Sequence, residues 1–324
     1  MIGYIFRRLI GAIPVVFGIT LISFFIIRIA PGKPTTIDGE LNPKISPEVR
    51  QKLYTLYGLD KPLPIQYYLW LKRMLRIDFG NSFVDGRPVT EKILERIPLT
   101  VGINLISLIC MFAIALPLGI CSAQKPGGVF DNLTTIIVFI FFAAPTFWIA
   151  LLLMQLICIH WGWLPISGVT SLDFEYLNWW QKIQDITRHL ILPIFVTTLS
   201  GLAGISRYMR SSMIEVLNQP YILAAKAKGL PHKIVIYKHA LRNAILPIVT
   251  LVGLSIPGLL GGSVIFESLF ALPGLGRLFY EAVVTRDYPL IMAEVVLSAV
   301  LTLLGNLIAD ISYALVDPRI RYKK

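Results

Sequence analysis

Apolar residues fall into six long runs separated by polar segments, and each run is long enough to cross a lipid bilayer. A spanning helix needs about 20 consecutive, mostly apolar residues. Lipid offers no partners for backbone polar groups, so a helix is the expected conformation of each run. The pattern therefore predicts an all-α integral membrane protein with six transmembrane helices. The runs are residues 9–29, 99–123, 133–160, 189–209, 244–268 and 289–315.

Prolines mark the places where these runs are expected to bend. Proline lacks a backbone N–H and its ring clashes with the preceding turn, so it kinks or breaks a helix. Five prolines that fall within these runs are expected to mark such bends. They are Pro14, Pro117, Pro145, Pro193 and Pro257.

A polar segment, residues 30–98, follows the first run and is too long to be a simple connection. It contains the stretch SPEVRQKLYTLYGLD. In this stretch Ser46 suits a helix N-cap, Pro47 the first helical position and Gly58 the stop. We expect a small folded subdomain here.

Composition supports the membrane assignment. Of the 324 residues, 55% are hydrophobic and only 15% are charged, whereas a soluble domain is about 25% charged. The net charge of +11 would suggest nucleic acid in a soluble protein, but in a membrane protein it indicates cytoplasmic loops enriched in Lys and Arg. Cys110, Cys121 and Cys158 lie in or beside apolar runs without metal-ligand spacing, so we interpret them as packing residues.

The charges of the short loops predict the orientation. Segment 207–243 holds seven basic residues and one acidic residue, Glu215. Segments 161–188 and 269–288 show no basic excess. The positive-inside rule therefore places 207–243 and both termini in the cytoplasm, and it places the 30–98 segment outside.

The most basic loop contains a predicted helix–turn–helix, which we call the cationic hairpin (residues 221–247). It reads YILAAKAKGLPHKIVIYKHALRNAILP and lacks Asp and Glu. Pro220 suits a first helical turn, Gly229 a left-handed C-terminal cap and Pro231 the start of a second helix. We expect the second helix to carry an apolar stripe. The stripe is Ile234, Tyr237, Leu241 and Ala244.

Three functions compete for the cationic hairpin. Each basic residue would cost about 2.5–3.5 kcal/mol in hydrocarbon, so the hairpin must leave the membrane. It could lie on anionic lipid, at about 1 kcal/mol per Lys or Arg, or it could dock onto another protein through the small residues of its first helix. A DNA-binding role is disfavoured because the second helix continues into a membrane span. The residues alone leave docking and lipid contact open.

The motif LAAKAKG, followed later by ILP, resembles the EAA loop of ABC importer permeases. Leu223 stands where the general pattern has Glu, and the spacing from Gly229 to Pro247 is longer than in the general pattern. Both departures are similar to the peptide and nickel branch of the family. Other segments resemble this branch along nearly the whole chain. They are DFGNSFVDGRPVTEKILERIPLT, APTFWIALLL, FALPGLGRLFYEAVVTRDYP and VDPRIRY.

The resemblance implies the type I permease fold of ABC importers and one half of a membrane pore. The implied partners are a second homologous permease subunit, two cytoplasmic ATPase subunits, an extracytoplasmic substrate-binding protein and membrane lipid, with no nucleic acid. In this family the short coupling helix sits in a cleft of the ATPase. That role is thereby implied for Ala224, Ala225, Lys228, Gly229 and Leu230. The chain itself would be non-catalytic and without a cofactor, while ATP and Mg²⁺ would be bound by the partner ATPases.

No motif indicates catalysis, nucleotide binding or a metal site. Gly32-Lys33 lacks the upstream glycine of a phosphate-binding loop. Gly274-Leu275-Gly276 lacks the third glycine of a dinucleotide fingerprint, and we interpret it as a tight turn at the pore mouth.

An ion-coupled secondary transporter is the alternative from another class, and it would need ionisable residues along a path. We interpret Arg28 and Glu267 as snorkelling near the outer face and Asp310 as pairing with a neighbouring helix. No inverted repeat is evident, which disfavours this alternative. The candidates are Arg28, Glu267, Glu294 and Asp310.

We predict the permease subunit of an ATP-driven importer in a bacterial or archaeal plasma membrane. Dipeptides or oligopeptides lead as substrates, and nickel, glutathione or oligosaccharides are alternatives for the same role. The sequence leaves open the substrate pathway and whether the second permease is a different chain or a copy. The expected divisions are a transmembrane helix at 1–29, an outer subdomain at 30–98, a permease core at 99–316 with the coupling loop 207–243, and a cytoplasmic tail at 317–324.

Overall fold

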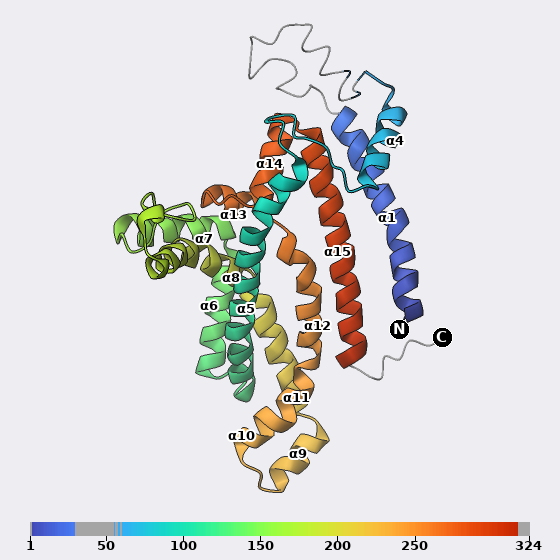
Figure 1. The fold of residues 1–324 in the computed structure, drawn as a ribbon. Coiled ribbons are helices and arrows are strands. Elements are labelled where there is room, and N and C mark those ends of the chain that lie inside the picture. Colours follow the sequence, from blue (N-terminus) through green and yellow to red (C-terminus); the bar gives the residue numbers. More distant parts are fainter. Residues whose placement is uncertain (1, 30–54, 56–57, 59, 317–324) are drawn as a thin grey trace. The chain divides into compact units, whose positions relative to one another are not determined.

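The computed structural model describes residues 2–29, 55, 58 and 60–316, and this part of the chain is built from helices (Figure 1). Within it, the one isolated β-bridge pairs Asn81 with Pro88. The chain divides into two compact units. Unit 1 is Met1–Thr100, Leu260–Glu267 and Pro273–Leu304, and unit 2 is Val101–Leu259, Ser268–Leu272 and Gly305–Lys324.

Each unit has its own set of helices, with α5, η4, α13 and α15 contributing to both. Unit 1 contains α1 (Ile2–Ile29), α4 (Leu63–Met74), the start of α5 (Val89–Gln124), most of α13 (Val264–Leu269), α14 (Leu275–Thr285) and the first part of α15 (Tyr288–Val316). Unit 2 contains the rest of α5, then α6 (Val129–Ala143), α7 (Thr146–Leu153), η1 (Met154–His160), η2 (Phe174–Tyr176), α8 (Trp179–Leu217), α9 (Pro220–Ala227), α10 (His232–Ile234), η3 (Val235–Ala240), α11 (Leu241–Ala244), α12 (Leu246–Ser255) and η4 (Ile256–Leu260).

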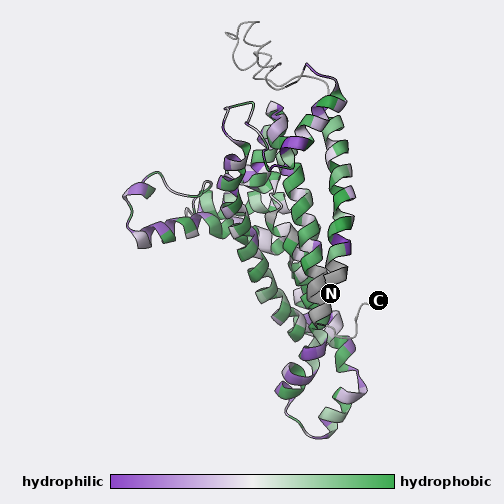
Figure 2. Cartoon of the chain, turned by 45° about the vertical axis from the view of Figure 1, so that its right-hand side comes forward, coloured by the Kyte–Doolittle hydropathy of each residue, from purple (hydrophilic) through white to green (hydrophobic). Residues whose placement is uncertain are grey.

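The helices account for the six predicted runs. Four are long and apolar enough to cross a membrane, namely Phe6–Ile29, Val89–Gln124, Trp179–Leu217 and Tyr288–Ile308. Two bent pairs, Val129–Ala143 with Thr146–His160 and His232–Ala244 with Leu246–Ser255, bring the number to six if each pair is one span. In Figure 2 the long helices are mainly green, the colour of hydrophobic residues. The prediction of an all-α membrane protein is confirmed.

The third and fifth predicted spans are not continuous helices. Between α6 and α7 the chain bends by 99° at Ala144 and Pro145. Pro145 has no N–H to donate an intrahelical hydrogen bond that would extend α6, and it directly precedes the first turn of α7. In the fifth run α12 ends at Ser255 and passes into the 3₁₀ helix η4, which contains Pro257. Proline thus ends helices at these two positions, whereas Pro14 and Pro193 lie inside α1 and α8.

In the 30–98 segment, the proposed caps Ser46 and Pro47 lie outside the described residues. Gly58 has φ +65°, as expected for a helix stop. Helix α4, which was not predicted from the sequence, packs beside α1 (Figure 1). Its buried residues Tyr67 and Trp70 stack with ring centroids 5.9 Å apart, and Tyr67 meets Phe24 of α1 at 5.3 Å. Their i, i+3 spacing is the signal by which α4 could have been found.

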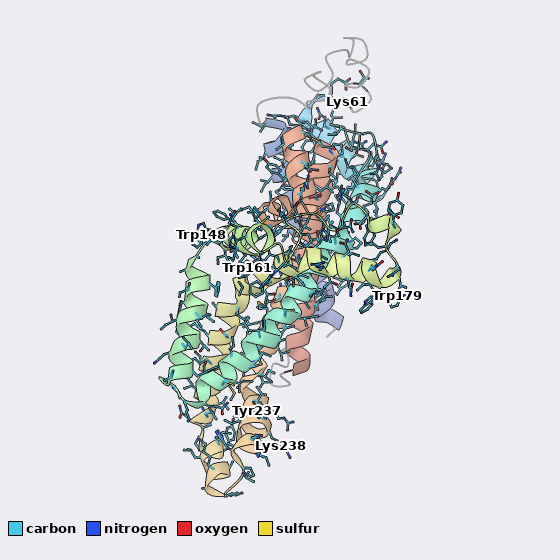
Figure 3. The ribbon with its side chains drawn as sticks, turned by 90° about the vertical axis from the view of Figure 1, so that its left-hand side faces the viewer. Lys61, Trp148, Trp161, Trp179, Tyr237 and Lys238 are labelled. Atoms are coloured by element: carbon cyan, nitrogen blue, oxygen red, sulfur yellow. The ribbon has the colours of Figure 1, made fainter. Side chains whose placement is uncertain are left out.

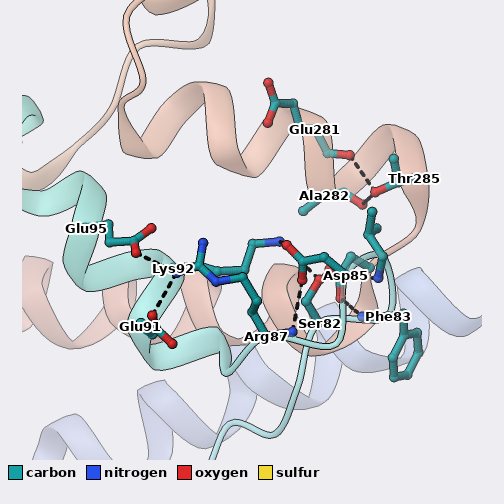
Figure 4. Close-up of polar contacts among 12 residues, drawn as sticks. Ser82, Phe83, Asp85, Arg87, Glu91, Lys92, Glu95, Glu281, Ala282 and Thr285 are labelled. Carbon is teal, nitrogen blue, oxygen red and sulfur yellow. Dashed lines mark hydrogen bonds and ion pairs between the residues drawn. The ribbon is translucent and has the colours of Figure 1, made fainter.

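A buried carboxylate closes the turn between α14 and α15 in unit 1. Asp287 is fully buried, and it accepts hydrogen bonds from Ser82 Oγ and, at 3.0 Å, from Phe83 N. The loop holding these donors is fixed by Lys92, whose Nζ lies 2.9 Å from Asp85 (Figure 4). In the same loop, Arg87 binds two carboxylates of α5. The loop is therefore tied both to α5 and to Asp287, directly before the start of α15, within unit 1. The Arg87 partners are Glu91 at 2.8 Å and Glu95 at 2.5 Å.

In unit 2, α5 and α8 approach closely. A Cβ on Gly119 would lie 2.6 Å from the Ser206 carbonyl oxygen, so only glycine fits at this crossing. One turn further along α8, Arg210 forms an ion pair with the buried Asp131 of α6. Asp131 also accepts from Gly127 N at 2.8 Å. Helices α5, α6 and α8 are therefore held together at the end of α8 that leads into the cationic hairpin.

Candidate functional site

The cationic hairpin is formed by α9, α10, η3, α11 and the start of α12, and it lies beyond the end of α8 (Figure 1). Pro220 is the first residue of α9, and α10 begins directly after Pro231. Gly229 follows the C-cap of α9 with φ +73°, which is the left-handed conformation predicted for it. An added Cβ at Gly229 would meet nothing within 4 Å, so the backbone angle rather than crowding favours glycine.

A buried apolar cluster attaches the cationic hairpin to the rest of unit 2. Ile222 and Ala225 of α9 are buried together with Met209 and Met213 of α8. Ser212 Oγ also donates to the carbonyl of Ala244 at 2.8 Å. The hairpin is therefore packed against α8 along its inner side. The remaining buried members are Ile120, Ala123, Val235, Ile236, Ala240, Ala244 and Ile248.

The predicted apolar stripe of the second helix is wrong in register. Ile234 and Tyr237 are 40% and 55% exposed, while Val235 and Ile236 are buried. The cause is η3, a π-helical stretch over Val235–Ala240 that changes the number of residues per turn. Of the predicted stripe, Ala244 is buried and Leu241 packs against the cluster.

The predicted coupling residues divide between two sides of α9. Ala224, Lys228, Gly229 and Leu230 are exposed. Ala225 is 7% exposed and belongs to the buried cluster, so its side chain supports the hairpin from inside. Leu223, which the prediction did not include, is 55% exposed. The outer surface of α9 thus combines small and apolar side chains with exposed basic residues around it.

The basic side chains of the cationic hairpin point away from its buried side. Figure 3 shows Lys238 next to the exposed Tyr237, at the end of unit 2 away from Trp148, Trp161 and Trp179. Tryptophans gather at membrane interfaces, which agrees with a hairpin at the opposite surface. The ion pairs found within the described ranges include none of the hairpin's five cations, so their charge is available to a partner. The cations are Lys226, Lys228, Lys233, Lys238 and Arg242.

The Gly274-Leu275-Gly276 segment is the start of a helix rather than a tight turn. Gly274 is the N-cap of α14, and a Cβ there would overlap the carboxylate of Glu267 at 2.3 Å. Glu267 accepts from Arg277 N at 2.7 Å and from Thr100 Oγ1 at 3.3 Å. A carboxylate at a helix N-terminus is favourable because it pairs with unsatisfied N–H groups.

The ionisable candidates of the sequence lie in different settings. Glu267 is 6% exposed and hydrogen-bonded, so the snorkelling interpretation is wrong for it. Arg28 lies over the rings of Phe24 and Tyr288, at 5.2 and 4.6 Å from their centroids. Glu294 is buried in α15, and the side chain of Asp310 lies outside the described ones.

Comparisons with known proteins cover the whole chain. Residues 115–322 match the family described as "Binding-protein-dependent transport system inner membrane component", and residues 1–104 match its N-terminal counterpart, "Binding-prot-dependent transport system membrane comp, N-term". The similarity to curated proteins is equally broad. The oligopeptide transport system permease protein AppB of Bacillus subtilis is 46% identical over 99% of this chain and 100% of its own length. The dipeptide transport system permease protein DppB of Escherichia coli K12 is 38% identical over 100% of both chains.

A glutathione transport system permease protein, GsiC of Salmonella paratyphi A, is 36% identical over 100% of both chains. Among solved structures, an inward-facing MetNI methionine ABC transporter is similar with a TM-score of 0.52 and 18% identity. That match covers 70% of this chain and 97% of the other, and at this identity it shows the fold alone.

Proposed function

The chain belongs to the family of binding-protein-dependent transport system inner membrane components, and we propose that it is the permease subunit that couples ATP hydrolysis to peptide uptake through the cationic hairpin. The observation that carries this proposal is the outer surface of α9. Leu223, Ala224 and Leu230 form an exposed, mostly apolar surface, and cations without ion pairs among the described residues surround it. A surface that rested only on anionic lipid would not need small side chains.

The packing of the hairpin supports a mechanical role. A force on α9 reaches α8 through Ile222, Ala225, Met209 and Met213, which form one buried cluster. Densely packed interiors transmit displacement instead of absorbing it. In this proposal, nucleotide binding favours one conformation of the ATPases, and the hairpin passes that preference to the membrane helices.

The proposal extends to the partners. ATP and Mg²⁺ are bound by two ATPase subunits, a second homologous permease completes the pore, and an extracytoplasmic binding protein delivers the substrate. Both termini lie in the cytoplasm because basic residues are concentrated in the hairpin loop and near the chain ends.

Short peptides are the proposed substrates. The support comes from the relatives that transport oligopeptides and dipeptides, at 46% and 38% identity. Glutathione, itself a tripeptide, is the second candidate, because a glutathione permease is 36% identical over the full length.

Crosslinking tests the docking role. A cysteine at Ala224, which is exposed, should crosslink to an ATPase subunit in the assembled transporter, whereas a cysteine at the buried Ala225 should not. Crosslinks from Ala224 only to lipid would refute docking.

A pair of substitutions at Gly229 tests coupling. Gly229→Ala and Gly229→Arg carry the same backbone cost of about 1–2 kcal/mol at a positive φ, but only Arg adds bulk to the surface. We expect Gly229→Arg to separate ATP hydrolysis from peptide uptake while membrane insertion is retained, and Gly229→Ala to stay coupled. Equal coupled uptake by both variants would contradict the role assigned to this surface.

A further inference from the structure

A cavity of about 520 Å³ lies within unit 1, between α1, residues 261–264, α14 and α15. Its walls are apolar apart from three residues of α15, Glu294, Ser298 and Thr302. Apolar members of the lining include Val15, Ile19, Leu275, Phe279 and Val295. Ser298 and Thr302 are exposed, so the cavity is open. Its volume falls in the range of about 300–1,000 Å³ that is usual for small-ligand sites.

Glu294 is the one acidic residue of this lining, and one of its carboxyl oxygens lacks a hydrogen-bond partner within the described residues. The residue is 6% exposed, and its Oε1 has no hydrogen-bond partner within the described part of the chain. An unsatisfied buried polar atom costs about 1–3 kcal/mol, and more when it is charged. The lining contains no Lys, Arg or His to offset that cost.

The neighbouring carboxylate makes the contrast clear. Glu267 has donors from Thr100 and Arg277, which explains its burial. Besides burial, a charge on Glu267 disfavours a negative charge on Glu294. Nothing in this part of the chain therefore accounts for keeping a carboxyl group at position 294. Ionisable groups buried in membrane helices are usually functional.

We propose that Glu294 is a binding residue for a primary ammonium group, the α-amino end of a short peptide passing through the transporter. The carboxylate would pair with the ammonium, Ser298 and Thr302 would offer hydroxyl groups, and the apolar walls would receive the first side chain. The identity of the ligand as a peptide rests on the proposed function. The preference of the cavity for cations is independent of the proposed function.

Thiol labelling in the assembled transporter tests the preference for cations. A cysteine at Ser298 lies one helical turn from Glu294 on the same lining. The measured quantity is the ratio of the labelling rate by a cationic methanethiosulfonate reagent to the rate by an anionic one. Near neutral pH, we expect this ratio to be on the order of tenfold higher with Glu294 than with Glu294→Gln. Mass spectrometry of the peptide that contains position 298 separates this label from the native cysteines.

Equal ratios in the two backgrounds would overturn the proposal, because they would mean that Glu294 is protonated or already paired with a subunit. The exposed Glu281, which pairs with Arg277, provides the matched control. Glu281→Gln should leave the ratio unchanged. If the Glu294→Gln complex does not assemble, Glu294→Asp carries the test, and it must keep the preference for the cationic reagent.

Protection by peptides identifies the ligand. With Glu294 intact, a free dipeptide should slow labelling at position 298 severalfold, and the same dipeptide with an acetylated amino group should not. Equal protection by both, or by neither, would overturn the ammonium assignment. If the transporter does not take up peptides at all but the charge preference persists, the peptide function fails while the cation site stands.

Discussion

The ion pair between Asp131 and Arg210 fixes the end of α8 that leads into the cationic hairpin. Arg210 Nε and Nη2 lie 2.5 and 2.6 Å from the two carboxylate oxygens of Asp131, a bidentate geometry. The Asp131 side chain is 3% exposed and that of Arg210 is 29% exposed. Replacing Asp131 with Asn keeps the volume, removes the charge and leaves the guanidinium with one acceptor oxygen in place of a bidentate carboxylate.

The magnitude follows from this burial. Breaking a fully buried pair by removing one partner costs about 3–5 kcal/mol. Arg210 reaches solvent in part, and screening reduces the effect for exposed groups. We therefore expect Asp131→Asn to lower the free energy of unfolding by about 2–3 kcal/mol.

A double-mutant cycle in mixed detergent micelles provides the measurement. Asp131→Asn, Arg210→Gln and the double variant should show a coupling energy of at least about 1.5 kcal/mol. The exposed pair Arg277 and Glu281, at 2.9 Å, is the control, and its coupling should stay below about 0.5 kcal/mol. Additive effects of the two substitutions in unit 2 would refute the view that this pair anchors α8.

Three further predictions concern other parts of the fold. Burial raises the pKa of Asp287 above its ordinary 3.8, against the hydrogen bonds from Ser82 and Phe83, so the folded state binds this proton more tightly than the unfolded chain. The free energy of unfolding should therefore fall as pH rises from about 3.8 through the raised pKa. In a pH series of thermal unfolding, Asp287→Asn should remove this fall of stability with pH. An unchanged dependence in the variant would contradict the prediction. A Cβ at Gly276 would lie 2.7 Å from backbone atoms of Gly262 and Val264, so Gly276→Ala should lower the free energy of unfolding by about 1–3 kcal/mol. The control is Gly204→Ala, whose Cβ would meet nothing within 4 Å and which should not lower it. Equal stability of the two variants would refute the close approach. Asn178→Ala should lower the free energy of unfolding by about 1 kcal/mol because it removes the capping box with Gln181. Asn178→Asp should keep a stability near that of the wild type. An unchanged stability of the Ala variant would show that the cap is dispensable.

Local chemistry explains the successful predictions about the hairpin. Pro220 and Gly229 act through their own backbone angles, and the structure has both in the expected places. The register of the second helix was missed because a π-helical stretch leaves no clear mark in the residue pattern. The inward orientation of Ala225 was missed because it depends on which side of α9 faces α8.

The sequence by itself determined the membrane class, the six apolar runs and the turn chemistry of the hairpin, because each depends on residues close together in the chain. The tertiary structure decided which helices break, which carboxylates are satisfied and where a cavity remains. Glu267 and Glu294 have the same side chain and both are buried, yet Glu267 accepts from Thr100 and Arg277, whereas Oε1 of Glu294 has no partner within the described residues. Such partners are brought together by packing over long sequence separations, and for that reason the sequence pattern alone does not reveal them.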